Sequence, residues 1–278
     1  IGKKYGLDLA LTSNGALLNS DKLERMLPHL TWIRFNILAT TEDYFYKMHR
    51  PVRKKRDSRQ NVLNNIKNSV QIKKKNNLDV SINVLTCVFD QNMNDVENTN
   101  QVVKEIGVDY IQIKPPSINQ HNIERNDFAV TLSNNYDFLK NLEETYNDEN
   151  FSVYVRWNLF NDKQKKVYTV CYGIPFIWSI DGDGGVYGCG SFLEEGKYCF
   201  GNINEMSFKE ILTSERTLEV MKLLQTMPEK KYCDSLCRPH TINKFLWSVK
   251  QHPNSEKYLA EEIKKSKVKQ KPDHINFI

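Results

Sequence analysis

The sequence predicts an α/β fold in its first part and a different, cysteine-containing region after it. Over the first 115 residues, short apolar runs of the kind that form strands alternate with helix-like patterns. This alternation is typical of a parallel sheet with right-handed crossovers. Beyond residue 150 the pattern changes to short β-prone runs, Gly-rich turns and most of the cysteines. An open doubly wound sheet and a partial barrel both fit the first pattern.

The elements of the first part follow from its apolar periodicity. Strands are expected at Leu7 to Thr12, Thr31 to Leu38, Val80 to Val88 and Val108 to Ile113. Helices are expected at Asp21 to Met26, around Val62 to Val70, and from Val96 to a stop at Gly107. A further helix is expected to open at Ser133 as its N-cap, and a strand over Phe151 to Trp157.

The composition describes a chain that can bury a good core. The 278 residues are 40% hydrophobic, and no run reaches the roughly 18 apolar residues of a membrane span. The net charge of +5 is spread along a Lys- and Asn-rich sequence, so composition alone does not imply nucleic-acid binding. We therefore expect a cytoplasmic protein with no membrane or nucleic-acid partner. Because Ile1 follows no initiator methionine or leader, we expect a processed chain or a fragment.

Four cysteines form the strongest motif. Cys171 and Cys189 flank an Asp-Gly-rich tract that predicts a hairpin, which would fold Cys189 back towards Cys171. Cys233 and Cys237 lie one helical turn or one tight loop apart, so both can face one metal. Four thiolates can hold zinc or an iron–sulfur cluster, and their spacing leaves both open. Disulfides are disfavoured in a chain without a secretory leader.

The cysteine pattern resembles the auxiliary-cluster domain, SPASM or its shorter twitch form, that follows the barrel of radical S-adenosylmethionine (SAM) enzymes. The pattern consists of Cys171, twelve residues, Gly184, four residues, Cys189, a gap, Cys233-x3-Cys237, and then Arg238 to Asn243. Gly201 to Ile203 and Ser207 to Ile211 also resemble the strand and helix that link the two cysteine pairs. The long form has one further Cys-x2-Cys, which is absent here. The resemblance therefore implies one auxiliary [4Fe–4S] cluster on the four cysteines, with Cys199 as an extra or substitute candidate and Cys87 as a core thiol.

The first part resembles the later strands of the radical SAM partial barrel. Thr12 to Gly15 resembles the threonine-asparagine-glycine that ends the third strand, and Arg34 to Asn36 resembles the arginine-x-serine of the fourth. The implied fold is a truncated partial (β/α) barrel followed by a small α+β cluster domain. Polar residues at the carboxyl ends of parallel strands lie where ligands bind. The implied SAM contacts are Ser13, Asn14, Asn36, Asn83 and Gln112.

The resemblance also implies parts that this sequence lacks. In the family, a Cys-x3-Cys-x2-Cys loop holds the catalytic [4Fe–4S] cluster and a Gly-Gly-Glu tract holds SAM, and both would precede Ile1. We therefore expect the full-length protein to bind SAM and a second [4Fe–4S] cluster, and this chain alone to be inactive. The expected domains are 1–150, the barrel part; 151–250, the cluster domain; and 251–278, a basic tail.

The implied activity is reductive cleavage of SAM followed by radical hydrogen abstraction from an unidentified substrate, with an electron donor such as flavodoxin or ferredoxin. A four-cysteine zinc-binding interaction module and an iron–sulfur scaffold without radical activity remain as alternatives. The connection from Ala39 to Ser58 carries a basic run that begins at Arg50, with Arg59 just beyond. This run would either attract an anionic substrate at the catalytic face or be a solvated surface.

Overall fold

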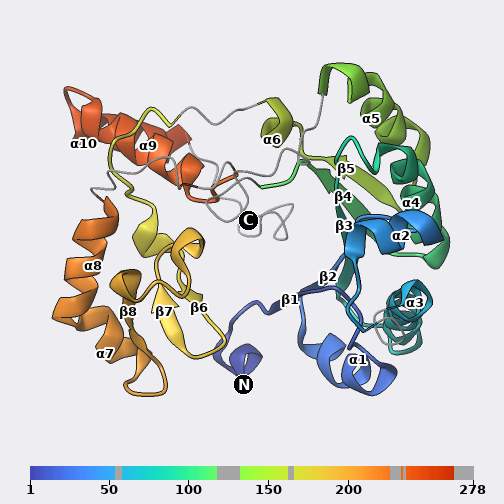
Figure 1. Cartoon of the computed structure of the whole chain (residues 1–278). Coiled ribbons are helices and arrows are strands. Elements are labelled where there is room, and N and C mark those ends of the chain that lie inside the picture. The colour runs from blue at the N-terminus through green and yellow to red at the C-terminus, as the bar shows by residue number, and fades with distance from the viewer. Residues whose placement is uncertain (54–57, 118–131, 162–165, 226–232, 234–235, 266–278) are drawn as a thin grey trace. The chain divides into compact units, whose positions relative to one another are not determined.

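In the computed structural model, the described residues are 1–53, 58–117, 132–161, 166–225, 233 and 236–265. The chain divides into two units, one made of residues 1–116 and 125–162 and the other of residues 117–124 and 163–278. Each unit has its own sheet and its own hydrophobic core (Figure 1).

The first unit contains a five-stranded sheet in the order β1-β2-β3-β4-β5, and all neighbouring strands are parallel. The strands are β1 Ala10–Ser13, β2 Trp32–Asn36, β3 Ser81–Cys87, β4 Tyr110–Lys114 and β5 Ser152–Val155. The predicted parallel sheet is confirmed, and each expected strand run overlaps one of these strands, with β1 and β4 extending one residue further than expected. Since β5 pairs with β4, this unit continues past the boundary expected at residue 150.

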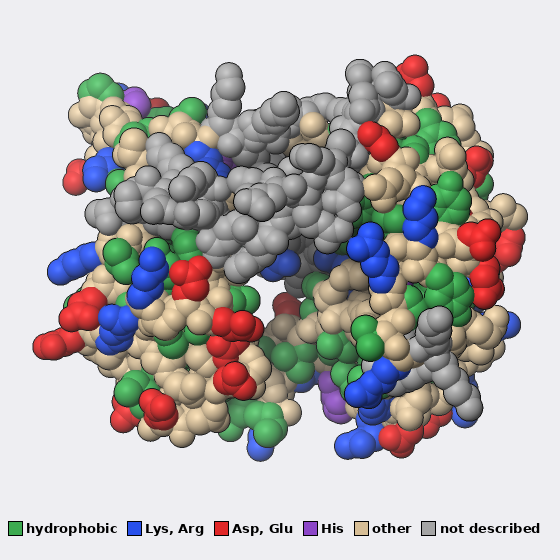
Figure 2. All heavy atoms as spheres, in the orientation of Figure 1, with side chains coloured by type: hydrophobic (Ala, Val, Ile, Leu, Met, Phe, Trp, Pro, Cys, Tyr) green, Lys and Arg blue, Asp and Glu red, His purple; other side chains and the backbone are tan. Residues whose placement is uncertain are grey.

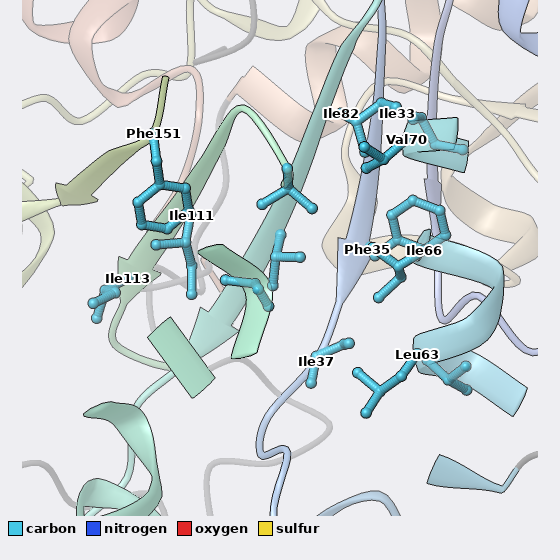
Figure 3. Packing of buried hydrophobic residues seen from close by; sticks show 14 of the residues in the cluster. Ile33, Phe35, Ile37, Leu63, Ile66, Val70, Ile82, Ile111, Ile113 and Phe151 are labelled. Carbon is cyan, nitrogen blue, oxygen red and sulfur yellow. The ribbon is translucent and has the colours of Figure 1, made fainter. Parts of the chain in front are cut away.

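Helices cover one face of this sheet (Figure 1). The helices of this unit are α1 Ser20–Met26, α2 Glu42–His49, α3 Arg59–Lys75, α4 Met93–Ile106, α5 Leu132–Tyr146 and α6 Trp157–Asn161, and its 3-10 turns are η1 Gly2–Tyr5 and η2 Leu27–His29. Alternate strand residues such as Phe35 and Ile111 are fully buried on that face, and Phe35 lies beside Ile66 of α3 (Figure 3). The predicted glycine stop is confirmed, because Gly107 ends α4 with φ at +88°.

Two segments that were not expected to be helical contain helices in the structure. The connection from Ala39 to Ser58 contains α2, which buries Phe45 and carries acidic residues in its first turn and basic residues in its last. Both groups of charges interact favourably with the helix dipole and so stabilise α2. The stretch expected to be a basic tail begins with α10 Ser255–Lys265, whose Lys257 and Glu261 form an i,i+4 ion pair. Helix α5 also begins at Leu132, one residue before the expected N-cap Ser133.

Asp109 holds the amino ends of three strands together. Its carboxylate accepts a hydrogen bond from the Ile82 backbone N–H at 2.6 Å and pairs with Lys73 Nζ at 2.6 Å. Its own backbone N–H donates to the Ile82 carbonyl, and its carbonyl accepts from the Ser152 N–H. One residue therefore connects α3, β3, β4 and β5 at the edge of the sheet where those strands begin.

The second unit is built on a three-stranded antiparallel sheet, β6 Ser179–Ile180, β7 Gly185–Tyr187 and β8 Cys199–Asn202. The predicted hairpin is confirmed: Asp181 Oδ1 accepts from the backbone N–H groups of Asp183 and Gly185, and Gly184 has φ at +87°. The other elements are η4 Ile174–Phe176, η5 Gly190–Phe192, η6 Gly196–Tyr198, α7 Phe208–Thr213, α8 Glu215–Gln225, α9 His240–Gln251 and α10. The expected linking helix is α7, which Ser207 and Glu210 begin with a capping box.

The surface agrees with the modest net charge. On the face shown in Figure 2, Lys and Arg side chains are interspersed with Asp and Glu side chains over the described residues. None of the helices in the described part of the chain combines the length and the apolarity that a membrane span requires.

Candidate functional site

The four predicted ligand cysteines all belong to the second unit. Cys171 and Cys189 pack against its core, which includes Ile174 from η4 and Phe200 from β8. Cys171 precedes η4, and Cys189 is the residue before η5, just beyond the hairpin. Cys233 lies between α8 and α9, and Cys237 lies just before α9. The four side chains are half-buried thiols.

The thiols are close enough to affect one another's ionisation. Burial raises the pKa of the Cys237 thiol to about 12, the charge of Lys166 opposes the rise, and the other three cysteines add to it. Burial also raises the pKa of Cys189, against a hydrogen bond from Ser191 and with contributions from Cys233 and Cys171. Four crowded thiolates are unfavourable in a buried place without a cation, and a bound metal ion or cluster supplies that positive charge.

Three of the four cysteines line a small cavity of about 30 Å³. Its lining residues are Lys166, Tyr168, Thr169, Val170, Cys171, Cys233, Cys237 and Asn243. Within the described residues, no three His, Cys, Asp or Glu side chains already stand in a metal-binding arrangement. A space of this size holds about one or two water molecules, so the thiols must separate to admit a four-iron cluster. The donor set, four soft thiolates, suits both an iron–sulfur cluster and zinc.

The remaining two cysteines behave differently from these four. Cys199, at the start of β8, donates a hydrogen bond from Sγ to the Gly201 carbonyl at 3.3 Å, and it does not contribute to the pKa shifts of Cys189 or Cys237. Cys87 lies on β3 of the first unit, where burial raises its pKa against the charge of Lys114. The pKa shifts of Cys189 and Cys237 thus group these four cysteines without Cys199 or Cys87.

Two buried residues near the thiols were not expected from the sequence. Tyr168 Oη lies 3.1 Å from His240 Nδ1, and both side chains are almost fully buried. Burial and the charges of the nearby cysteines raise the pKa of Tyr168. His240 is the first residue of α9 and lies in the segment that follows Cys237 in the motif. This position was the one signal in the sequence that could have indicated a role for His240.

The five predicted SAM-contact residues all lie in the first unit, on β1 to β4 or in the turn after β1. The strand register places Arg34 beside Asn83 and places Asn36 beside Leu85, which in turn lies beside Gln112. These residues lie in positions that alternate with the core-facing ones, so they belong to the face that the core does not cover. Asn36, Asn83 and Gln112 therefore share one face of the sheet.

Ser13 and Asn14 occupy a different position. The register pairs Ser13 with Phe35, in the row that faces the helices, and pairs Thr12 with Arg34 on the open face. Ser13 Oγ accepts from the Gly15 N–H at 3.0 Å, and Asn14 Oδ1 accepts from the Ala16 N–H at 3.1 Å. Their side chains therefore order the turn after β1, and Thr12 is the β1 residue that the open face includes.

Asn83 and Gln112 differ in their hydrogen bonding although both are fully buried. Asn83 Oδ1 accepts from Arg34 Nε at 3.1 Å, and its Nδ2 donates to the Ile33 carbonyl at 3.0 Å. The Gln112 amide oxygen and nitrogen have no hydrogen-bond partner among the described residues. Since buried amides are nearly always paired, Gln112 is the residue of this face that offers a donor and an acceptor to a ligand.

Polar side chains also fix the loops at the carboxyl ends of β2 and β3. The buried Asp95 carboxylate accepts from the backbone N–H of Thr40 at 2.6 Å and from that of Thr41 at 3.3 Å. Asn92 Nδ2 donates to the carbonyls of Leu38 and Cys87. Arg59 donates to the Thr40 carbonyl, so it holds this loop instead of extending freely from the basic run.

The sequence of residues 171–239 matches the model of the SPASM family, an iron–sulfur cluster-binding domain. This segment contains all four grouped cysteines. No curated protein matches this chain.

Several solved structures have a similar fold. Streptococcus suis SuiB has a TM-score of 0.56 and 9% sequence identity, over 91% of this chain and 59% of that chain. SuiB bound to the precursor peptide SuiA has a TM-score of 0.55 and 10% identity, over 91% and 58%. A third structure, anSMEcpe with bound AdoMet, has a TM-score of 0.46 and 17% identity, over 77% and 56%.

At these identities the likeness concerns the fold, and the chain spans 56% to 59% of the length of these solved proteins. The resemblance expected from the cysteine pattern is confirmed by the SPASM match, and the expected partial-barrel fold is confirmed by the likeness to SuiB. Residues 171–239 therefore match an iron–sulfur cluster-binding domain of the SPASM family, and the chain as a whole has a fold similar to that of SuiB.

Proposed function

We propose that the protein is a radical SAM enzyme in which Cys171, Cys189, Cys233 and Cys237 hold one auxiliary [4Fe–4S] cluster. The observation that carries this proposal is the coincidence of two independent findings. The SPASM match covers the four cysteines, and in the folded chain the pKa of Cys237 is raised by the other three thiols and that of Cys189 by Cys233 and Cys171, in addition to burial. Neither finding involves Cys87, which belongs to the other unit.

The residues around the thiols have definite tasks in this proposal. When bound to a [4Fe–4S] cluster that keeps one open iron, SAM can be cleaved reductively to give a 5′-deoxyadenosyl radical, which abstracts hydrogen from a substrate. The four cysteines hold the auxiliary cluster, and their burial keeps solvent away from the sulfurs. Lys166 lies near Cys237, and its positive charge offsets part of the thiolate charge.

On the sheet, we assign SAM contacts to the polar residues that the sequence indicated. Gln112 offers an unpaired amide in a buried place, and Asn36 is exposed at the end of β2. Asn83 orients Arg34 through its hydrogen bond to Nε. Ser13 and Asn14 shape the turn after β1, so their contribution is to position the backbone there.

The catalytic cluster requires cysteines that this sequence does not contain. Its six cysteines include no Cys-x3-Cys-x2-Cys. We therefore expect the 278-residue polypeptide to bind the auxiliary cluster and to leave SAM intact under reducing conditions. Joining a segment that carries the triplet to its amino end is expected to produce 5′-deoxyadenosine.

The substrate and the electron donor are further parts of the proposal. The structure of SuiB with the precursor peptide SuiA makes a peptide the first substrate class to test. The side chains of Arg50 and Arg53 are exposed after α2, and their positive charge favours an anionic substrate. Residues 54–57 of the basic run lie outside the described residues. A flavodoxin or ferredoxin is the proposed electron source.

Metal content decides between this proposal and its alternatives. After anaerobic reconstitution with iron and sulfide, we expect about four irons per chain and an EPR signal on reduction. Cys87→Ser is the matched control, because Cys87 is a half-buried thiol outside the group of four, and its iron content should not change. Stoichiometric zinc without iron under the same conditions would establish the zinc-binding module instead. A triplet-restored chain that binds iron but never cleaves SAM would establish the inactive scaffold.

A further inference from the structure

Asn243 makes two side-chain hydrogen bonds to the segment that begins at Cys171. The side chain is fully buried in the first turn of α9. Its Oδ1 accepts from the Gly173 backbone N–H at 2.8 Å, and its Nδ2 donates to Cys171 Sγ at 3.3 Å. Asn243 lies four residues beyond the end of the SPASM match at residue 239.

The direction of the amide follows from its partners. A backbone N–H can only donate, so the oxygen of the Asn243 amide must face Gly173. The amide nitrogen is thereby directed at the sulfur of Cys171, to which it can only donate. The N–H to sulfur contact is therefore a consequence of the Gly173 hydrogen bond.

The backbone of the two segments is fitted to this contact. A Cβ at position 173 would collide with Pro239 and would also stand 3.3 Å from Asn243 Nδ2, so glycine allows the close approach. His240 N–H donates to the Cys237 carbonyl at 3.1 Å, which ties the start of α9 to the last cysteine. Asn243 thus connects the first ligand cysteine with the helix that follows the last one.

The contact has a chemical effect on a cluster held by these thiols. Hydrogen bonds to the sulfurs are among the factors that set the reduction potential of an iron–sulfur cluster. An amide N–H stabilises negative charge on sulfur, and the reduced cluster carries more of that charge than the oxidised one. Such a donor therefore raises the reduction potential.

We propose that Asn243 is a positioning residue that holds Cys171 as a ligand and raises the reduction potential of the auxiliary cluster by donating a hydrogen bond to its sulfur. This inference rests on the proposed function, because it requires Cys171 to bind the cluster. It gives a role to a residue that is not a cysteine and lies beyond the SPASM match, and that role can be measured without any substrate.

The test compares midpoint potentials in the reconstituted 278-residue polypeptide by EPR-monitored redox titration. Asn243→Leu keeps the size of the side chain but removes both hydrogen bonds, so the potential should become more negative and iron should be lost faster to a chelator. Asn243→Gln keeps the amide on a longer side chain and should restore part of the potential. Thr241→Ala, at an exposed position of the same helix, is the matched control and should shift neither quantity.

A second measurement uses the unmodified protein, in case the variants do not fold. With ¹⁵N-asparagine labelling, pulsed EPR of the reduced cluster should show a ¹⁵N coupling transmitted through the hydrogen bond, and Asn243→Gln should remove it.

The outcomes separate the two proposals. An unchanged reduction potential in Asn243→Leu protein that contains the cluster would overturn the role of Asn243 but leave the cluster proposal intact. The absence of the ¹⁵N coupling in the unmodified protein would have the same meaning. A polypeptide that takes up no iron would contradict the cluster proposal and this inference with it.

Discussion

The two units of the chain are stabilised by different means. Among the described residues, the first unit has a core cluster of 29 buried hydrophobic residues, whereas that of the second unit has seven. In the second unit, Cys171 and Cys189 pack against this smaller core. Small domains with little apolar burial usually need a metal or another crosslink, because core burial alone does not offset the entropy of folding. The comparison indicates that the first unit folds by packing and that the second depends on its metal.

The largest expected effect is on the second unit when one ligand is removed. Cys189→Ala should release the iron and expose most backbone amides between Cys171 and Cys237, since the free energy of metal binding is also free energy of folding there. Hydrogen exchange with mass spectrometry measures this in both units at once. The five-stranded sheet should keep its protection. A Cys189→Ala protein that loses iron but keeps a protected second unit would show that packing alone suffices.

The reciprocal change is made in the core of the first unit. Phe35 is fully buried between the sheet and α3, so Phe35→Ala should cost about 3–5 kcal/mol of unfolding free energy. Urea unfolding measures the loss, and the iron content of folded protein should stay at the unmodified value. Loss of iron in parallel with loss of the sheet would mean that the two units do not fold independently.

A medium effect concerns acid stability of the first unit. Burial lowers the pKa of His49 to about 4, and its Nε2 accepts from the Leu38 N–H. His49 is protonated near pH 6.5 in the unfolded chain but only near pH 4 in the folded chain. The contribution of neutral His49 to the free energy of unfolding is therefore fully present above pH 6.5 and is lost as the pH falls from 6.5 to 4. The loss should amount to roughly 3 kcal/mol by pH 4.

The matched variant is His49→Gln, which keeps an acceptor for the Leu38 N–H but does not titrate in this range. Urea unfolding at pH 7.5 and pH 5 should show a smaller pH dependence for this variant than for the unmodified chain. An equal dependence in both proteins would assign the acid sensitivity to other groups.

The smallest expected effect is on thermal stability, and it distinguishes the side-chain amides of Gln112 and Asn83 on the open face of the sheet. Gln112→Met removes two unpartnered polar atoms, so thermal stability should stay constant or rise by about 1 kcal/mol. Asn83→Leu, the comparison variant, removes the acceptor of Arg34 Nε and should destabilise the sheet. Calorimetry of the ligand-free polypeptide measures both. A destabilising Gln112→Met would show that this amide has a structural role instead of a ligand-binding one.

The sequence predicted the strands well because the sheet core is apolar and its crossovers are regular. It did not predict α2, since the consecutive Tyr44, Phe45 and Tyr46 conceal which of them is buried. For α10, the many lysines concealed an amphipathic helix. Both helices depend on charge placement and on packing that a local pattern does not show.

The candidate site was predictable only where its signal is local. The cysteine spacing and the hairpin turn indicated the four thiols, and the resemblance to the partial barrel indicated Asn83 and Gln112, which the strand register places on one face. Asn243 and the Tyr168–His240 pair depend on contacts between residues 70 and 72 positions apart, which only the fold brings together. Ser13 was assigned to the ligand face from its motif, although strand alternation places its neighbour Thr12 there.

Asp109 has a consequence for how the loops of the first unit can change. It fixes the relative positions of β3, β4 and β5 from the edge where these strands begin. Loops that leave the opposite edge can therefore gain or lose residues without shifting any strand past its neighbour. Insertions there should leave the strand register unchanged, so the tolerance of one edge to variation depends on a carboxylate at the other.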